Sequence, residues 1–196
     1  MKMLLFISLL MLISCGYKNN TSQTINSQQD TVRTENSSTA LYSDTNFVSV
    51  FLDYEFSGEI QIFDKPNGKV IRKVKNDFDA EDNVMFGMLD KNDSMFYVVA
   101  YWALDGREII KGWIYKNNHL GIFTRNYTID TPLILYSTPN SYKNIIVIDK
   151  EYNPNMYEVV DFEERWLKIK ANIKGKMYQG WIPHDMQCWN VYSTCN

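Results

Sequence analysis

The chain has 196 residues, a formal net charge of −3 and 14% aromatic residues. It contains no run of Lys and Arg and no basic patch, which argues against nucleic acid as a partner and against electrostatic docking on a membrane. Its length is enough for one medium-sized domain or two small ones.

The first predicted element is an export signal over residues 1–14. A single charge at Lys2 precedes an apolar run over residues 3–13, which is shorter than the roughly 20 residues a membrane-spanning helix needs. Residues 12–15 (Leu-Ile-Ser-Cys) resemble the lipobox of bacterial lipoprotein precursors. The resemblance implies that Cys15 receives acyl chains such as palmitate and anchors the protein to a membrane of the cell envelope. The alternative is an ordinary secretory signal that leaves Cys15 as a free thiol.

A tether is predicted over residues 15–40, which are rich in Asn, Ser, Thr and Gln and nearly free of large apolar residues. Such a segment cannot bury enough apolar surface to offset the entropy of ordering it, so we expect it to be disordered.

The remaining cysteines form an even pair. With Cys15 lipidated, Cys188 and Cys195 lie outside the cytoplasm, where disulfides persist. We predict a disulfide between them rather than two free thiols.

Short runs rich in Val, Ile, Tyr, Phe and Trp begin at residue 47, separated by Asn-Gly, Asp-Gly and Lys-Gly turns, and no window has a sustained helical period. The pattern predicts an all-β chain. The predicted strands are Phe47–Phe56, Glu59–Phe63, Val84–Leu89, Met95–Trp102, Glu108–Tyr115, Leu133–Tyr136, Asn144–Ile148, Met156–Asp161, Trp166–Ala171 and Lys176–Ile182.

Two halves of this β region share one order of motifs. Residues 60–68 (IQIFDKPNG) align with residues 133–141 (LILYSTPNS), and residues 111–115 (KGWIY) align with residues 179–183 (QGWIP). The repeat predicts two domains, at residues 41–124 and 127–196.

The second half resembles a bacterial SH3 domain. The resemblance rests on Pro139-Asn140, a Trp-x-Lys-Ile stretch beginning at Trp166, and the Gly-Trp-Ile motif at residues 180–182. The first half is looser, with Phe96 or Tyr97 in place of that first tryptophan. Together with its C-terminal segment, the chain is similar to SH3-domain proteins of Bacteroidetes. The resemblance implies two tandem small SH3-like barrels, in which the motif's glycine lets a strand bend and its tryptophan packs across a barrel end.

Residues suited to catalysis or metal binding are few. His119 and His184 are the only histidines and lie in predicted turns, and Glu163-Glu164 lies in a polar turn. A cluster of acids at residues 77–82 lacks the spacing of a calcium loop and is predicted to be a solvated loop. We therefore expect no enzyme, no cofactor and no metal site.

The resemblance implies binding instead, through aromatic side chains that offer large, rigid contact areas. Core packing is the competing interpretation for the tryptophans. Two ligands stay open: a cell-wall component such as a peptidoglycan peptide, or an envelope protein for which this chain is a docking scaffold or regulator. The candidate contact residues are Tyr136, Tyr142, Trp166 and Trp181, with Phe63, Tyr97 and Trp113 as their counterparts in the first half.

Overall fold

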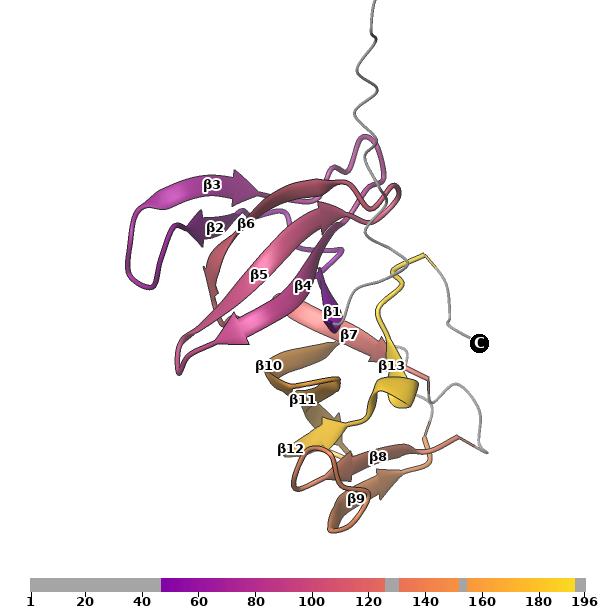
Figure 1. Cartoon of the computed structure of the whole chain (residues 1–196). Coiled ribbons are helices and arrows are strands. Elements are labelled where there is room, and N and C mark those ends of the chain that lie inside the picture. The colour runs from indigo at the N-terminus through magenta and orange to yellow at the C-terminus, as the bar shows by residue number, and fades with distance from the viewer. Residues whose placement is uncertain (1–46, 126–130, 152–154, 193–196) are drawn as a thin grey trace, which may run out of the picture. The chain divides into compact units, whose positions relative to one another are not determined.

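The computed structural model of the protein describes residues 47–125, 131–151 and 155–192 (Figure 1). Within these ranges the regular structure is β-strand, apart from a short 3-10 helix, η2 (His184–Met186). The prediction of an all-β chain is confirmed. No helix among these residues is long and apolar enough to cross a membrane. The predicted export signal, the tether and Cys15 lie outside the described residues.

The first half of the described chain contains six strands, and the second half repeats that number before a last short strand. The strands are β1 (Ser49–Leu52), β2 (Ile60–Phe63), β3 (Val70–Val74), β4 (Val84–Lys91), β5 (Met95–Trp102), β6 (Glu108–Tyr115), β7 (Leu120–Thr124), β8 (Leu133–Tyr136), β9 (Ile145–Asp149), β10 (Tyr157–Glu163), β11 (Trp166–Ile173), β12 (Lys176–Ile182) and β13 (Gln187–Cys188).

The strands pair in one open antiparallel sheet whose order repeats itself. From one outer edge to the centre the order is β3-β2-β6-β5-β4-β1, and from the other edge it is β9-β8-β12-β11-β10-β7. The two series meet where β1 pairs with β7, with Phe51 opposite Gly121 and Leu52 opposite Leu120. β13 adds to β7 off this path. The pairing shows a continuous sheet; the two separate small barrels stay a prediction.

Three strands of the described chain differ from the prediction, which does not include β3, β7 or the two-residue β13. β3 reads Val-Ile-Arg-Lys-Val and is largely exposed, so its two internal charges hid the apolar pattern. β7 reads Leu-Gly-Ile-Phe-Thr and pairs with β1 and β10. It stands in the second series where β1 stands in the first, so by strand order the second copy begins at Leu120 rather than at residue 127.

The register repeats together with the order. Phe63 lies opposite Trp113, and Tyr136 lies opposite Trp181. A bulge precedes Phe63 in the β2–β3 pair and Tyr136 in the β8–β9 pair. These equivalences are the ones that the alignment of the two halves predicted.

The predicted first-half counterpart of Trp166 is wrong. Tyr97 lies opposite the tryptophan of the first Gly-Trp-Ile motif, and Lys168 lies opposite that of the second. Tyr97 therefore corresponds to Lys168, and the residue that corresponds to Trp166 is Met95, two positions earlier. The error arose because matching aromatic with aromatic in sequence ignores which residues the sheet places opposite each other.

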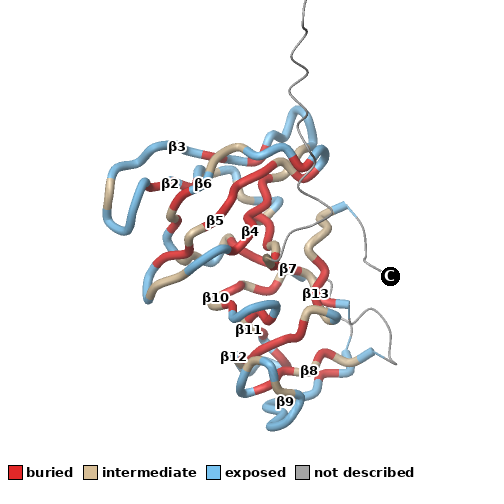
Figure 2. Tube along the Cα trace, viewed as in Figure 1, coloured by how far each residue is buried: buried red, intermediate tan, exposed pale blue. Residues whose placement is uncertain are grey.

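One hydrophobic core is shared by the two halves. A single cluster of buried side chains includes Val50 and Val98 of the first half and Leu120, Leu135 and Ile169 of the second. Figure 2 shows the buried residues concentrated along β4, β5 and the strands around the β1–β7 junction, whereas β3 and β9 at the two edges are mostly exposed. Neither half is packed around an isolated core.

The C-terminal segment crosses back to the first half. β13 pairs with β7, and Trp189 packs against the clusters around Val50 and around Phe51. The Tyr192 hydroxyl accepts a hydrogen bond from the Asn83 backbone N–H at 3.1 Å, in the loop before β4. The contacts of Trp189 and Tyr192 thus hold the C-terminal segment against the first half.

Cys188 lies within this C-terminal segment. It is fully buried and disulfide-bonded. Its predicted partner, Cys195, lies outside the described residues, so the pairing itself stays a prediction.

Lys91 forms a polar link between the halves. Its Nζ, at the end of β4, lies 2.9 Å from Asp161 Oδ1 and 3.1 Å from Glu163 Oε2. It also donates to the Phe162 carbonyl. Burial alone would lower the pKa of Lys91, but the hydrogen bonds and charges of Asp161 and Glu163 outweigh it and raise the pKa above its usual 10.5.

Replacement of Lys91 by methionine is expected to lower the free energy of unfolding by about 1–2 kcal/mol at neutral pH, because a partly buried charged hydrogen-bond network is lost. A raised pKa in the folded state means that this contribution is complete below the unfolded value of 10.5 and is lost as pH rises through the folded value. Urea unfolding at several pH values should therefore show the two proteins converging only in strong alkali. Lys111→Met is the matched control, because Lys111 is half exposed and pairs only with Glu108. Equal losses in the two variants would contradict the role of Lys91.

Candidate functional site

The four aromatic residues predicted as ligand contacts come together on one face of the second half. Tyr136 ends β8, Trp166 begins β11, Trp181 lies in β12, and Tyr142 lies in the loop between β8 and β9. The ring centroids of Tyr136 and Trp166 are 5.6 Å apart, and those of Tyr142 lie 5.6 Å from Tyr136 and 5.2 Å from Trp166, all in edge-on geometry. Such T-shaped contacts are favourable because the ring edge is positive and the face negative. We call Tyr136, Tyr142, Trp166 and Trp181 the aromatic cluster.

Most of the aromatic cluster is buried. Tyr136, Trp166 and Trp181 are 6–7% exposed, whereas Tyr142 is 63% exposed. Burial, with smaller contributions from Tyr142 and Asp185, raises the pKa of Tyr136. Tyr136, Trp166 and Trp181 are therefore packed within the fold. Tyr142 is the member of the aromatic cluster whose ring is exposed to solvent.

Two lysines border the aromatic cluster. Lys168 Nζ and Lys91 Nζ each lie 5.9 Å from the centroid of the Trp181 ring. At this distance a cation is attracted to the face of an indole. Neither lysine was predicted as part of the site. The period-2 pattern around Trp166 could have suggested Lys168, whereas Lys91 is distant in sequence and lies near Trp181 only in the folded chain.

The first half has a related but different arrangement. Phe63 packs edge-on against Tyr115 at 5.4 Å, and Tyr97 packs against Trp113 at 5.4 Å. Tyr115 is 43% exposed and lines, with Phe63 and His119, a cavity of about 230 Å³. Met95 takes the place of Trp166, and the loop between β2 and β3 has no aromatic residue in place of Tyr142, so the first half lacks two rings of the aromatic cluster.

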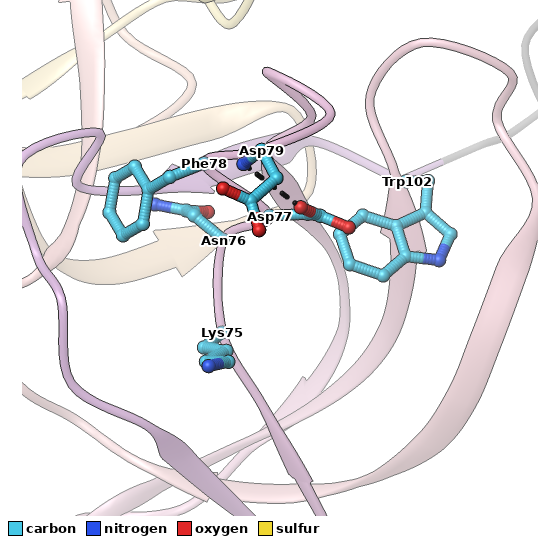
Figure 3. A pocket seen from close by; sticks show the side chains of 6 residues that line it. All are labelled: Lys75, Asn76, Asp77, Phe78, Asp79 and Trp102. Carbon is cyan, nitrogen blue, oxygen red and sulfur yellow. Dashed lines mark hydrogen bonds between the residues drawn. The ribbon is translucent and has the colours of Figure 1, made fainter.

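A wider cavity of about 420 Å³ opens beside the acidic loop of the first half (Figure 3). Its lining includes the exposed ring of Phe78, the carboxylates of Asp77 and Asp79, and the indole of Trp102. Asp77 Oδ1 accepts backbone hydrogen bonds from Asp79 at 3.1 Å and Ala80 at 3.0 Å. The Asp77 carboxylate thus stabilises the turn of its own loop. No group of three or more acid, His or Cys side chains suited to a metal occurs among the described residues.

The histidines and the paired glutamates have structural contacts. His119 stacks on Phe56 with ring centroids 3.8 Å apart, and its Nδ1 lies 3.7 Å from Asp53 Oδ2. His184 lies in η2, where burial, followed by the charge of Arg165, lowers its pKa. Glu163 Oε2 lies 3.1 Å from Lys91 Nζ, which also contacts the carboxylate of Asp161 at 2.9 Å.

Comparison with known proteins adds little. No protein-family model and no curated protein matches the sequence. A solved structure, that of NlpC1 from Trichomonas vaginalis, is similar over 76% of this chain with 16% identity and a TM-score of 0.30. The chain spans 48% of the length of that protein. A similarity this low supports no statement about fold or function.

Proposed function

We propose that the chain is a non-catalytic binding lipoprotein of the cell envelope, anchored through Cys15, whose second half binds its ligand at the aromatic cluster. The observation that supports this most is the exposure of Tyr142, which is 63% exposed while resting edge-on against two buried rings. A rigid, partly exposed aromatic residue on a packed base loses little conformational entropy on binding, and this is a common property of binding hot spots.

The finer fold belongs to the same proposal. Each six-strand series is interpreted as a divergent SH3-like unit, the two units being fused through β1 and β7. The repeated bulges and the repeated pairing of Phe63 with Trp113 and of Tyr136 with Trp181 support this interpretation.

The proposed ligand is a cell-wall component such as a peptidoglycan peptide. A short peptide of this kind has carboxylates that suit Lys168, beside Trp181, and aliphatic side chains that suit the Tyr142 ring. The second candidate is an envelope protein. It is favoured by the exposed Ile145 and Ile148 on β9, each 49% exposed, which offer apolar area beyond what a small peptide would cover.

Co-sedimentation of the purified chain with cell-wall sacculi tests this proposal. Tyr142→Ala is expected to weaken retention about 30-fold, the loss typical of one hot-spot side chain. Tyr142 is a cleaner target than Trp166, because truncating the buried Trp166 ring would also destabilise the fold. Tyr115→Ala is the matched control, since Tyr115 is an exposed ring against Phe63 in the first half.

The outcomes separate the two ligands. Retention that falls with Tyr142→Ala and not with Tyr115→Ala supports wall binding at the aromatic cluster. Absence of retention, with a protein cross-linked to the chain through the face around Tyr142, supports docking. Retention unchanged by Tyr142→Ala would place the contact elsewhere and contradict the proposal.

A further inference from the structure

The cavity beside the acidic loop (residues 77–82) is lined by charges of both signs (Figure 3). Asp77 and Asp79 supply carboxylates, and Lys75, which directly follows β3, supplies an ammonium group. The cavity volume of about 420 Å³ lies within the range of about 300–1,000 Å³ that is usual for small-molecule sites. None of the lining residues belongs to the aromatic cluster, so this cavity is a candidate binding site of its own.

The opposite charges of the cavity are not paired with each other. Lys75, Asp77 and Asp79 are all exposed, and within the described part of the chain no ion pair joins the lysine to either carboxylate. Asp77 is partly occupied, because its Oδ1 accepts the backbone N–H groups of Asp79 and Ala80. The Asp79 carboxylate makes no such hydrogen bond to any described residue. A cavity that keeps a cation and an anion apart suits a ligand that carries both charges.

Two aromatic side chains add apolar walls to the cavity. Phe78 is 54% exposed, whereas Trp102, at the end of β5, is half-buried and packs against the core. In Figure 3 the Phe78 ring and the Trp102 indole lie on opposite sides of the two carboxylates. Aromatic rings offer large, rigid contact areas to an apolar group. The ligand that fits best therefore has an apolar part as well as two opposite charges.

The loop that carries Phe78 is held in place by its own hydrogen bonds. The backbones of Asp77 and Asp82 exchange two hydrogen bonds of 2.9 Å. The Tyr192 hydroxyl of the C-terminal segment donates to the Glu81 carbonyl at 3.0 Å. Side chains on a loop that is already ordered lose less conformational entropy when a ligand binds.

We propose that this cavity binds a free α-amino acid with an apolar side chain, in its zwitterionic form. Asp79 receives the ammonium group of the ligand, with Asp77 adding negative charge beside it, and Lys75 receives the ligand's carboxylate. Phe78 and Trp102 contact the apolar side chain. Hydrogen bonds between charged partners are stronger than those between neutral ones, so pairing both charges selects a zwitterion against molecules with a single charge.

Isothermal titration of the full chain with L-leucine, as purified in detergent from the producing cells, tests the proposal. We expect saturable binding with a dissociation constant in the submillimolar range, which is modest for a ligand of this size. N-acetyl-L-leucine lacks the ammonium group and L-leucinamide lacks the carboxylate. Each is expected to bind about fivefold more weakly than leucine, because one charged contact is lost.

Matched variants connect each charge of the ligand with its partner. Lys75→Met is expected to weaken leucine binding about fivefold and to leave leucinamide binding unchanged, because leucinamide lacks the group that Lys75 contacts. Asp79→Asn is expected to weaken leucine binding to the same extent and to leave N-acetyl-leucine binding unchanged. Phe78→Ala should weaken the binding of all three ligands. The controls are Lys73→Met and Asp93→Asn, two exposed charges of the first half outside the cavity, which should leave leucine binding unchanged.

Three results would overturn the proposal. The first is the absence of saturable binding at millimolar leucine. The second is leucine binding that Lys75→Met, Asp79→Asn and Phe78→Ala all leave intact, which would place the site elsewhere. The third is equal binding of leucine, N-acetyl-leucine and leucinamide, which would show that the two charges of the ligand are not recognised. These measurements contain no sacculi and do not depend on Tyr142, so this inference is tested separately from the proposed function.

Discussion

Gly112→Ala is expected to lower the free energy of unfolding by about 3 kcal/mol, at the upper end of what overpacking a core costs. A Cβ at this position would lie 2.5 Å from Ile62 Cγ2 and 2.7 Å from the Phe63 carbonyl oxygen. The second contact is with backbone, which cannot move aside without breaking the pairing of β2 with β6. The glycine of the first Gly-Trp-Ile motif is therefore required because another strand approaches it closely.

The equivalent Gly180→Ala is expected to cost less, about 1–2 kcal/mol. Its Cβ would lie 2.7 Å from Leu135 Cβ, but the Tyr136 carbonyl oxygen is at 3.2 Å, farther than the 2.7 Å of the Phe63 carbonyl oxygen from Gly112, so the backbone contact is milder. Gly175→Ala serves as a control of another kind, because Gly175 has φ +81° and nothing within 4 Å. There the cost comes from the left-handed backbone alone, about 1 kcal/mol.

Chemical denaturation of these three variants measures their losses in free energy of unfolding and so checks the expected order. Losses that follow Gly112, Gly180 and Gly175 from largest to smallest would support close approach as the reason for the motif. If the alanine at Gly112 were tolerated as well as the one at Gly175, strand approach would not explain the glycine.

Asn76→Leu is expected to lower the free energy of unfolding by about 2–4 kcal/mol. Asn76 is 2% exposed, and its amide joins two segments of the first half. Nδ2 donates to the Asp53 carbonyl at 2.9 Å, and Oδ1 accepts from the Val84 N–H at 2.9 Å. Leucine leaves the Val84 N–H without this partner, and a buried unpaired group costs about 1–3 kcal/mol. The Asp53 carbonyl keeps the hydrogen bond from the Phe56 N–H at 3.0 Å, so the loss of the Asn76 donor there costs about 1 kcal/mol.

Asn76→Asp separates the two hydrogen bonds. The carboxylate still accepts from the Val84 N–H but cannot donate to the Asp53 carbonyl, and its charge is buried. The loss in free energy of unfolding caused by Asn76→Asp should therefore become smaller as the pH falls and the carboxyl is protonated. The loss caused by Asn76→Leu should not change in this way. Asn117→Ala is the control. The Asn117 amide donates to the Tyr115 carbonyl and accepts from the His119 N–H, both within the turn after β6, so its loss should be about 1 kcal/mol. Urea unfolding at several acidic pH values measures these losses. If the free energies of unfolding of the Asp and Leu variants changed in parallel with pH, the roles given to the two hydrogen bonds of Asn76 would be contradicted.

The two halves differ most on the outward face near the sheet edge. There the second half has Ile134, Ile148 and the aromatic cluster, whereas the first half has Gln61 and Lys73 opposite each other. Apolar side chains thus extend from the aromatic cluster to the edge of the sheet in the second half only. The proposed ligand contact at the aromatic cluster depends on this difference between otherwise repeated units.

Much of the fold could be predicted from local patterns. Alternation of apolar and polar residues has a period of two along a strand, so the all-β class and most of the strands followed from the sequence. The turn asparagines are another local signal: Asn67 and Asn140 both adopt a left-handed backbone, with φ of 55° and 54°, which Asn tolerates better than most residues. They mark the same turn in each half, and the alignment of the halves identified them as equivalent.

What the sequence could not determine depends on which strands lie side by side. Two internal charges hide the apolar residues of the edge strand β3, and Gly121 interrupts the apolar run of β7, so neither was predicted. The counterpart of Trp166 was misassigned because the residues that face Trp113 and Trp181 are set by pairing between strands, which has no local signal in the sequence. By itself the sequence determined most of the strands, their turns and the aromatic residues of the site. Only the tertiary structure decided that the halves share one sheet and one core, that Tyr142 is the exposed member of the cluster, and that Lys91 and Lys168 border it, because contacts between distant residues depend on register and packing.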